Sequence, residues 1–146
     1  MFRGHFRHTI DPKGRVSIPA KFRDLLTESQ DAELVVVPTG NALDVHPLSE
    51  FKNLEARVKA LPSQSPLRRH FLYSYVSRGL DVELDRNGRI QVPQDYRERA
   101  GLKRDVVIIG MMESFEVWDA ERYTRFERET ITPLDELRQK LGELGV

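Results

Sequence analysis

Two kinds of hydrophobic pattern alternate along the chain. Short runs rich in β-branched residues predict buried strands at 34–37 and 106–109, and the runs at 43–45 and 115–118 predict the strands that return beside them. Elsewhere, apolar residues recur every three or four positions, which is the period of an amphipathic helix. The pattern as a whole predicts a mixed α+β chain.

The middle of the chain is predicted to be helical. Apolar residues keep the helical period from Leu48 to Leu61, and the segment 62–66, with two prolines and two serines, breaks it. Ser65 is placed to cap a second helix, with Pro66 at its first position and Gly79 just beyond its end. We therefore expect two helices in succession here.

One segment of the sequence occurs twice. Ile10-Asp11-Pro12-Lys13-Gly14-Arg15-Val16-Ser17-Ile18-Pro19 reappears 74 positions later as Leu84-Asp85-Arg86-Asn87-Gly88-Arg89-Ile90-Gln91-Val92-Pro93, and Phe22-Arg23 is matched by Tyr96-Arg97 at the same spacing. A second block, Leu43-Asp44-Val45 followed by Phe51, recurs 72 positions later as Phe115-Glu116-Val117 followed by Tyr123. Two copies of one unit therefore account for most of the chain.

Each copy is predicted to contain a β-hairpin followed by a short helix. Strands at 5–10 and 82–84 lead into an Asp-x-x-Gly-Arg turn, and the Asn87-Gly88 pair favours the positive φ angles of a tight hairpin. Pro12 and Gly14 supply related turn chemistry in the first copy. The prolines that end each repeat are expected at the first position of helices at 20–26 and 94–100.

We divide the chain into four parts on this basis. They are a first unit at 5–48, a helical connector at 49–76, a second unit at 77–120 and a C-terminal helical segment at 121–146. A last helix is expected after Thr132-Pro133, with leucines 134, 137, 141 and 144 on one side. This leucine stripe fits either a subunit interface or packing on the protein's own core.

Composition narrows the possible classes of protein. The 146 residues contain no cysteine, which excludes disulfide scaffolds, zinc ribbons and thiol catalysis. The N-terminus lacks the continuous apolar stretch of a signal peptide, and the apolar runs are too short to span a bilayer. We therefore expect a cytoplasmic protein with no membrane partner.

Charge is balanced overall but unevenly distributed. The chain has 23 basic and 23 acidic residues, yet residues 1–23 hold six basic residues against one acid, and residues 84–104 hold six against three. Residues 113–146 have nine acids against five bases. Positive charge therefore gathers on the two repeated hairpins, as expected if one face meets phosphate groups.

The repeated turn has a structural and a functional interpretation. Asp11 and Asp85 can accept hydrogen bonds from the turn and from the arginine four residues later, and Gly14 and Gly88 are needed for the turn in either case. In the functional interpretation a narrow β-ribbon enters the DNA major groove and its arginines bind guanine. The candidate DNA-binding residues are Arg15 and Arg89 for bases, and Lys13, Arg86, Arg3 and Arg7 for phosphates.

A family resemblance rests on these same residues. Met1-Phe2-Arg3-Gly4, the first repeat extended to Arg23, and the second repeat at 84–93 together closely resemble the bacterial MraZ family, whose members have two SpoVT/AbrB-type domains in tandem. The resemblance covers nearly the whole chain. It implies a swapped-hairpin β-barrel, in which the two halves pair about an internal pseudo-twofold axis, with flanking helices.

The same resemblance implies a function. Members of the family are sequence-specific transcriptional regulators, usually repressors, of a cluster of division and cell-wall genes that begins with their own gene. They assemble into rings and bind short direct repeats in double-stranded DNA upstream of that cluster. By motif, Arg15 and Arg89 take the central DNA contact, with Asp11 and Asp85 as their partners. A nucleoid-associated location follows from this function.

Two classes of protein other than a regulator bear comparison with this sequence. An enzyme is disfavoured because His5 and His8 should lie on opposite faces of a strand, His46 and His70 are isolated, and no catalytic motif is found. We expect no metal, cofactor or small-molecule substrate. The alternative is an antitoxin-type protein-interaction module, although such proteins usually have one domain and a disordered tail, whereas residues 113–146 have a helical pattern.

Overall fold

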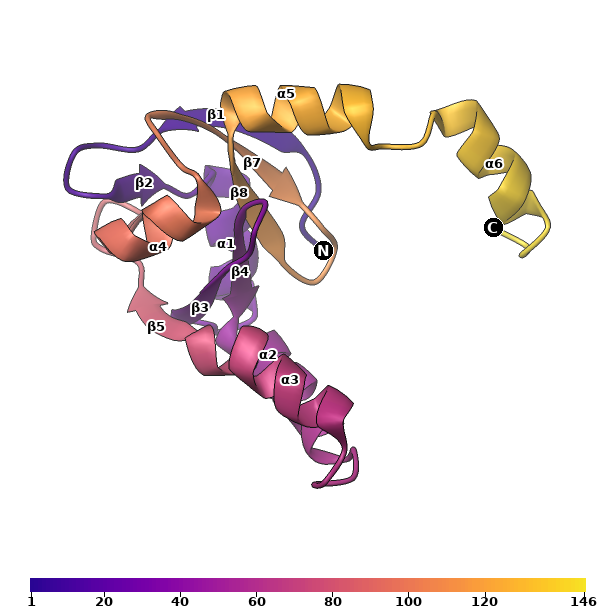
Figure 1. Ribbon diagram of the computed structural model, residues 1–146. Coiled ribbons are helices and arrows are strands. Elements are labelled where there is room, and N and C mark those ends of the chain that lie inside the picture. Colours follow the sequence, from indigo (N-terminus) through magenta and orange to yellow (C-terminus); the bar gives the residue numbers. More distant parts are fainter.

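The chain folds as a mixed α+β protein, as predicted. The computed structural model describes residues 1–146 (Figure 1). In chain order its elements are β1 (His5–Thr9), β2 (Arg15–Ser17), α1 (Ala20–Glu28), β3 (Glu33–Pro38), β4 (Leu43–Pro47), α2 (Leu48–Lys59), α3 (Pro66–Ser74), the 3-10 helix η1 (Val76–Arg78), β5 (Leu80–Glu83), β6 (Arg89–Gln91), α4 (Gln94–Ala100), β7 (Asp105–Gly110), β8 (Phe115–Asp119), α5 (Ala120–Glu129) and α6 (Leu134–Gly142).

The two halves of the chain exchange strands. A six-stranded sheet has the order β1-β7-β8-β4-β3-β5, so β1 of the first half pairs with β7 of the second, and β5 of the second half pairs with β3 of the first. A separate two-stranded ribbon joins β2 to β6, also across the halves. All these pairs are antiparallel. Each half therefore completes the strand pairing of the other.

The sheet does not close into the expected barrel. Strands β1 and β5 remain its free edges, and the ribbon joins β1 only through one isolated bridge, between Ile10 and Val16. Each ribbon strand is three residues long because Pro19 or Pro93 follows shortly after it. Proline has no N–H to donate, so the ladder ends and the chain turns into a helix.

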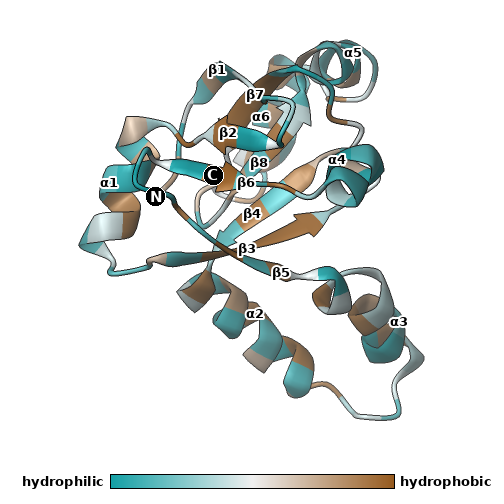
Figure 2. Ribbon diagram, turned by 90° about the vertical axis from the view of Figure 1, so that its left-hand side faces the viewer, coloured by the Kyte–Doolittle hydropathy of each residue, from teal (hydrophilic) through white to brown (hydrophobic).

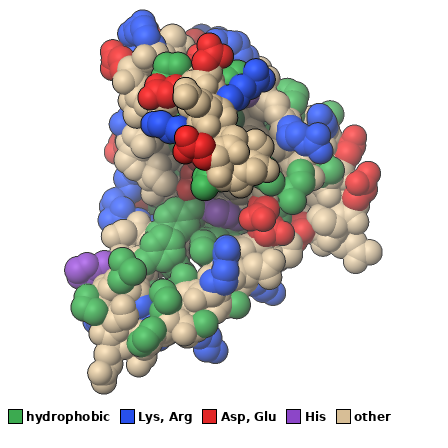
Figure 3. Space-filling view, turned by 90° about the vertical axis from the view of Figure 1, so that its right-hand side faces the viewer, with side chains coloured by type: hydrophobic (Ala, Val, Ile, Leu, Met, Phe, Trp, Pro, Cys, Tyr) green, Lys and Arg blue, Asp and Glu red, His purple; other side chains and the backbone are tan.

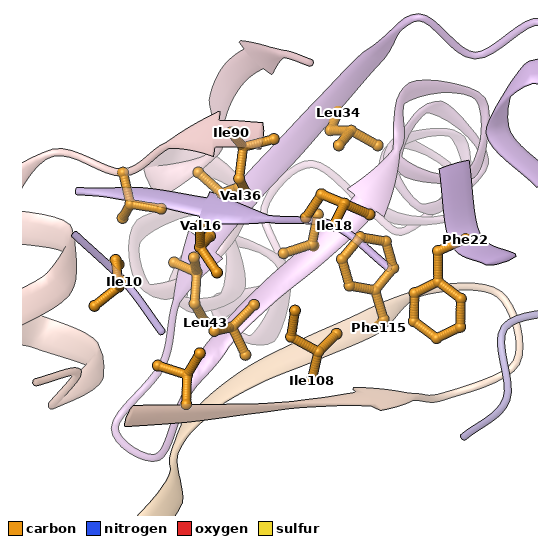
Figure 4. Close-up of a cluster of buried hydrophobic side chains, with 14 of the residues drawn as sticks. Ile10, Val16, Ile18, Phe22, Leu34, Val36, Leu43, Ile90, Ile108 and Phe115 are labelled. Atoms are coloured by element: carbon orange, nitrogen blue, oxygen red, sulfur yellow. The ribbon is translucent and has the colours of Figure 1, made fainter. Parts of the chain in front are cut away.

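The hydrophobic core lies between the ribbon and the six-stranded sheet. Val16 and Ile90 face each other in the ribbon register, and neither has any exposed surface. They belong to a cluster of 18 buried residues that also includes Phe22, Ile108 and Phe115 (Figure 4). The inner face of the ribbon is therefore one wall of the core, built equally by both halves.

The positions of the helix-initiating prolines differ from the prediction. Pro19 and Pro93 are N-cap residues with extended ψ angles of 139° and 153°, and α1 and α4 begin one residue later. The carbonyl of Pro19 already accepts from the N–H groups of Phe22 and Arg23, which is the role of an N-cap. Only Pro66 occupies the first helical position, because Ser65 precedes it as the predicted cap.

Gly79 also has a different role from the predicted one. Helix α3 ends at Ser74, η1 follows, and Gly79 has an ordinary φ of −63° rather than a left-handed conformation. A Cβ atom on Gly79 would lie 2.9 Å from Val35 and 3.1 Å from Phe51. Close packing between the connector and the sheet explains this glycine.

Two helical segments project from the body. Helices α2 and α3 form an arm at the bottom of Figure 1, where Phe51 anchors α2 beside β3, and polar and apolar residues alternate along both helices in Figure 2. Helix α5 packs near β7 and β8, whereas α6 extends away and buries none of its residues. Of the two roles left open for the leucine stripe, packing on its own core is wrong. No helix has the length and apolar character needed to cross a bilayer.

The ribbon is predicted to be essential for stability. Ile90→Ala should lower the free energy of unfolding by about 2–5 kcal/mol, because it leaves a cavity in the shared core. Ser17→Ala, on the outer face of the same ribbon, should change it by about 0.5 kcal/mol or less. Urea unfolding followed by circular dichroism measures both. Equal effects of the two substitutions would show that the ribbon is not part of the core.

Candidate nucleic-acid interface

The first repeated turn is closed by Asp11. Its Oδ1 accepts from the backbone N–H groups of Lys13 at 3.0 Å and Arg15 at 2.9 Å, and its Oδ2 accepts from Arg15 Nε at 2.6 Å. The backbone N–H of Gly14 donates to the Asp11 carbonyl at 2.9 Å. Hydrogen bonding from the Arg15 backbone, with a smaller contribution from its side chain, lowers the pKa of Asp11. The carboxylate therefore remains ionised and fixes the arginine.

The second turn repeats this geometry. Asp85 Oδ1 accepts from the N–H groups of Asn87 at 2.8 Å and Arg89 at 2.9 Å, and its Oδ2 accepts from Arg89 Nε at 3.0 Å. The pKa of Asp85 is lowered, again mainly by the backbone N–H of the arginine. The contacts that motif spacing suggested between each aspartate and its arginine are thus present in both turns.

Both arginines emerge on the same face of the ribbon. In the β2–β6 register, Arg15 lies opposite Gln91 and Arg89 lies opposite Ser17. Because side chains alternate along a strand, these four residues face outward while Val16 and Ile90 face the core. Each arginine uses Nε to bind its aspartate, and its terminal nitrogens are available to an external acceptor.

Two further arginines, not proposed as site residues from sequence, support the turns. Arg97 of α4 donates from Nε to the Val92 carbonyl at 3.1 Å, and its guanidinium lies 3.0 Å from where a Cβ on Gly14 would stand. Arg23 of α1 has the equivalent bond to Ile18 and lies against Gly88. Each helix thus braces the turn of the other half. Arg23 and Arg97 lie 74 positions apart, which is the offset of the repeat, so the repeat could have identified them as site residues.

The candidate phosphate-binding residues are only partly brought together. Lys13 and Arg86 are exposed in the two turns next to the ribbon. Arg7, in the middle of β1, lines a hollow with Lys103 and Arg104, and three acidic residues line the same hollow: Asp105, Asp119 and Glu121. Arg3 and the first turn lie beyond opposite ends of β1, whose 5 residues extend over about 17 Å at roughly 3.3 Å per residue. Figure 1 shows the N-terminus and β2 well apart.

The histidines of β1 are separated, as the strand period suggested. His5 is exposed and its ring contacts Tyr123 edge-on at 5.7 Å between centroids, whereas His8 is half-buried, and this burial lowers its pKa. The chain contains no group of three or more His, Cys, Asp or Glu residues that could hold a metal ion.

His46 is not isolated, contrary to the prediction. Its Nε2 lies 2.7 Å from the hydroxyl of Tyr75, which donates to Asp44 Oδ2 at 2.6 Å. Burial raises the pKa of Asp44 to about 6, and the nearby Glu116 adds to the increase. Burial and the Asp44 contact raise the pKa of Tyr75. This polar chain ties the end of the connector to β4.

The fold and site define a class of protein: two α+β units that exchange strands and present a duplicated Asp-x-x-x-Arg hairpin. The chain belongs to the MraZ family. The family model described as "MraZ protein, putative antitoxin-like" matches residues 1–73 and 79–141.

Curated relatives support the same assignment. Proteins named "Transcriptional regulator MraZ" from Acetivibrio thermocellus and Thermoanaerobacter pseudethanolicus are each 36% identical to the chain over 146 residues, which is 100% of both partners in each comparison. The protein of the same name from Heliobacterium modesticaldum is 38% identical over 141 residues, covering 97% of this chain and 96% of the relative. The similarity therefore extends over both units and the helical segments.

The glycine of each turn should be intolerant of a side chain. Gly14 has a φ of +83°, and a Cβ there would collide with the Val92 carbonyl, so Gly14→Ala should cost about 1–3 kcal/mol of stability. Gly40→Ala is the control, since no atom lies within 4 Å of its Cβ position. Thermal unfolding of the two variants gives the comparison, and a similar loss in both would contradict the turn geometry.

The raised pKa of Asp44 predicts a pH dependence of stability. Its ordinary value is 3.8, so between about pH 4 and pH 6 the folded protein holds a proton that the unfolded chain releases, and stability falls as pH rises through that window. Asp44→Asn stays neutral and should remove this component. Urea unfolding of both proteins should agree near pH 4 and diverge in favour of the variant by pH 7. Parallel curves would refute the assignment.

Proposed function

We propose that this protein is a sequence-specific DNA-binding regulator of transcription. The main support for this function is the β2–β6 ribbon. Its outer face presents Arg15 and Arg89 together, and each arginine is bound by its own aspartate. A two-stranded ribbon fits the width of the DNA major groove. The names of the curated relatives, transcriptional regulators throughout, support the same class.

The proposed contacts follow from the chemistry of the arginines. Arg15 and Arg89 donate from their terminal nitrogens to guanine O6 and N7, a pairing worth about 1–3 kcal/mol of discrimination each. Asp11 and Asp85 limit the motion of the guanidinium groups, which reduces the entropy lost on binding. Lys13 and Arg86 meet phosphates beside the ribbon.

The outlying basic residues have a lesser part in this proposal. Arg7, with Lys103 and Arg104 beside it, meets phosphates further along the duplex. Arg3 is too far from the ribbon to share its few base pairs, and so contacts DNA only where the duplex or a neighbouring subunit extends past it.

We further propose that each half is a SpoVT/AbrB-type unit and that the two together form a swapped-hairpin arrangement. The exchange of β1, β5 and the ribbon strands between halves supports this relation. The targets are then short direct repeats upstream of the protein's own gene, at the head of a division and cell-wall cluster that it represses. The protein acts in the cytoplasm at the nucleoid.

Self-assembly into a ring completes the proposal. One ribbon spans few base pairs, so a single chain binds weakly. Several chains on one scaffold that meet several repeats make the later contacts intramolecular, and the gain in avidity is about 10²–10⁴ when the geometry permits.

An antitoxin-type protein-interaction module is the second candidate, and the antitoxin-like wording of the family description favours it. Under this alternative, a small partner protein would be recovered in stoichiometric amounts from cells. The phenotype would then persist in a variant that no longer binds DNA.

DNA binding gives the direct test of the regulator. Fluorescence anisotropy with the duplex upstream of the gene, at several salt concentrations, should show specific, salt-sensitive binding that a scrambled duplex does not match. Arg15→Ala and Arg89→Ala should each lose about 1–3 kcal/mol of specific binding. Arg57→Ala, on the exposed surface of α2, is the control and should bind as the wild type does.

A conservative variant separates charge from base recognition. Arg15→Lys keeps the positive charge but loses the planar fork, so it should retain the salt dependence and lose the preference for the specific duplex. Equal binding of the two duplexes by the wild type, or none at low salt, would remove the basis of the regulator.

A further inference from the structure

An apolar groove of about 400 Å³ lies beside α5. Trp118 and Phe126 form its floor, with ring centroids 4.6 Å apart, and Ile109 packs beside them. Met111 and Ile131 line the groove with 51% and 41% of their surfaces exposed. We refer to it as the Trp118 groove. Figure 3 views the molecule from the side toward which α6 projects; the hydrophobic side chains that gather there, from the middle of the face to its lower left, lie over the helical arm, below the level of α5.

One wall of the Trp118 groove is acidic. Asp44 and Glu116 both line it and face each other directly in the β4–β8 register. Two carboxyl groups in this arrangement repel one another when ionised. The salt bridges of the chain involve other acids, so neither group has a cationic partner within the chain. A ligand that fits here combines an apolar surface with a positive charge.

Helix α6 has this combination. At 100° per residue, Leu134, Leu137 and Leu141 form a stripe, and Arg138 and Lys140 fall on its two flanks. The acidic residues of α6 occupy the opposite side of the helix. Leu134 and Leu141 are 60% and 38% exposed, and the helix buries nothing against its own body.

We propose that the Trp118 groove receives helix α6 from a second copy of this chain. The leucine stripe fills the apolar floor, and the flanking cations lie next to Asp44 and Glu116. In the structure α6 points away from the body that carries its own groove (Figure 1), so its stripe is offered to a neighbour.

The geometry of the contact determines the kind of assembly. Donor helix and acceptor groove are different surfaces, and every copy has one of each. A copy that receives α6 from one neighbour and gives its own α6 to another makes heterologous contacts. Heterologous contacts form closed rings when the rotation between copies closes. The inference thus rests on the self-assembly proposed above and supplies its interface. The contact between α6 and the Trp118 groove leaves the outer face of the β2–β6 ribbon free for DNA.

Solution mass tests the donor helix. The full-length wild type should sediment at several times the mass of the 16.9 kDa monomer, and Leu141→Asp should sediment as the monomer. Gln139→Asp is the matched control, because it adds the same charge on the opposite side of α6 and should stay assembled. Neither substitution disturbs packed residues, since α6 buries none.

The groove is tested by a second matched pair. Met111→Asp should also yield the monomer. Met112→Asp should remain assembled, because Met112 is exposed to a similar extent (61% against 51%) but does not line the groove.

Mixing the two disrupted variants gives the decisive outcome. Met111→Asp retains an intact α6 and Leu141→Asp an intact groove, so an equimolar mixture should form dimers of twice the monomer mass and grow no further. The proposal is overturned if the wild type is a monomer, if Leu141→Asp keeps the wild-type mass, or if the mixture stays monomeric, as it would if α6 docked in its own groove.

DNA anisotropy of Leu141→Asp separates the proposed interface from the proposed regulator. If this variant binds DNA more weakly but still with specificity and salt sensitivity, the regulator stands whatever the masses show.

Discussion

The pairing of β2 with β6, centred on Val16 and Ile90, is the contact on which the rest of the structure depends. It joins the two halves of the chain at the point where their repeated sequences meet. Its inner face closes the core, and its outer face presents the two arginines. Since each half also lends a strand to the other half's part of the sheet, neither half can bury its apolar surface alone. Fold and candidate site therefore share one set of residues.

The contact between aspartate and arginine in each turn positions the arginine side chain and adds little to the stability of the fold. Both partners are substantially exposed, with side-chain exposures of 35% and 30% in the first turn and 27% and 38% in the second, and ion pairs of this kind contribute only about 0–1 kcal/mol. What the carboxylate supplies is a fixed guanidinium whose outer nitrogens remain free. Arg23 and Arg97 extend this order, because each packs an α-helix of one half against the turn of the other.

Local features of the sequence were predictable, and contacts between distant segments were not. The Asp11–Arg15 turn and the Ser65 cap follow from residues within four positions of each other. The repeat predicted two equivalent units, but only the three-dimensional arrangement shows that Arg97 reaches Gly14, or that Tyr75 joins His46 to Asp44 across about 30 residues of chain. Periodicity identified the stripe of α6, yet it cannot tell an internal packing surface from an unoccupied one, because both need leucines at the same spacing.

We expect both turns of one chain to act together on DNA. The most direct measurement is a nitrogen–proton correlation spectrum of the arginine Nε–H groups during titration with the upstream duplex. The signals of Arg15 and Arg89 should shift together and saturate at the same DNA ratio, while those of Arg57 and Arg69 on the helical arm should not move. Shifts confined to the arm, or equal shifts with a scrambled duplex, would contradict this expectation.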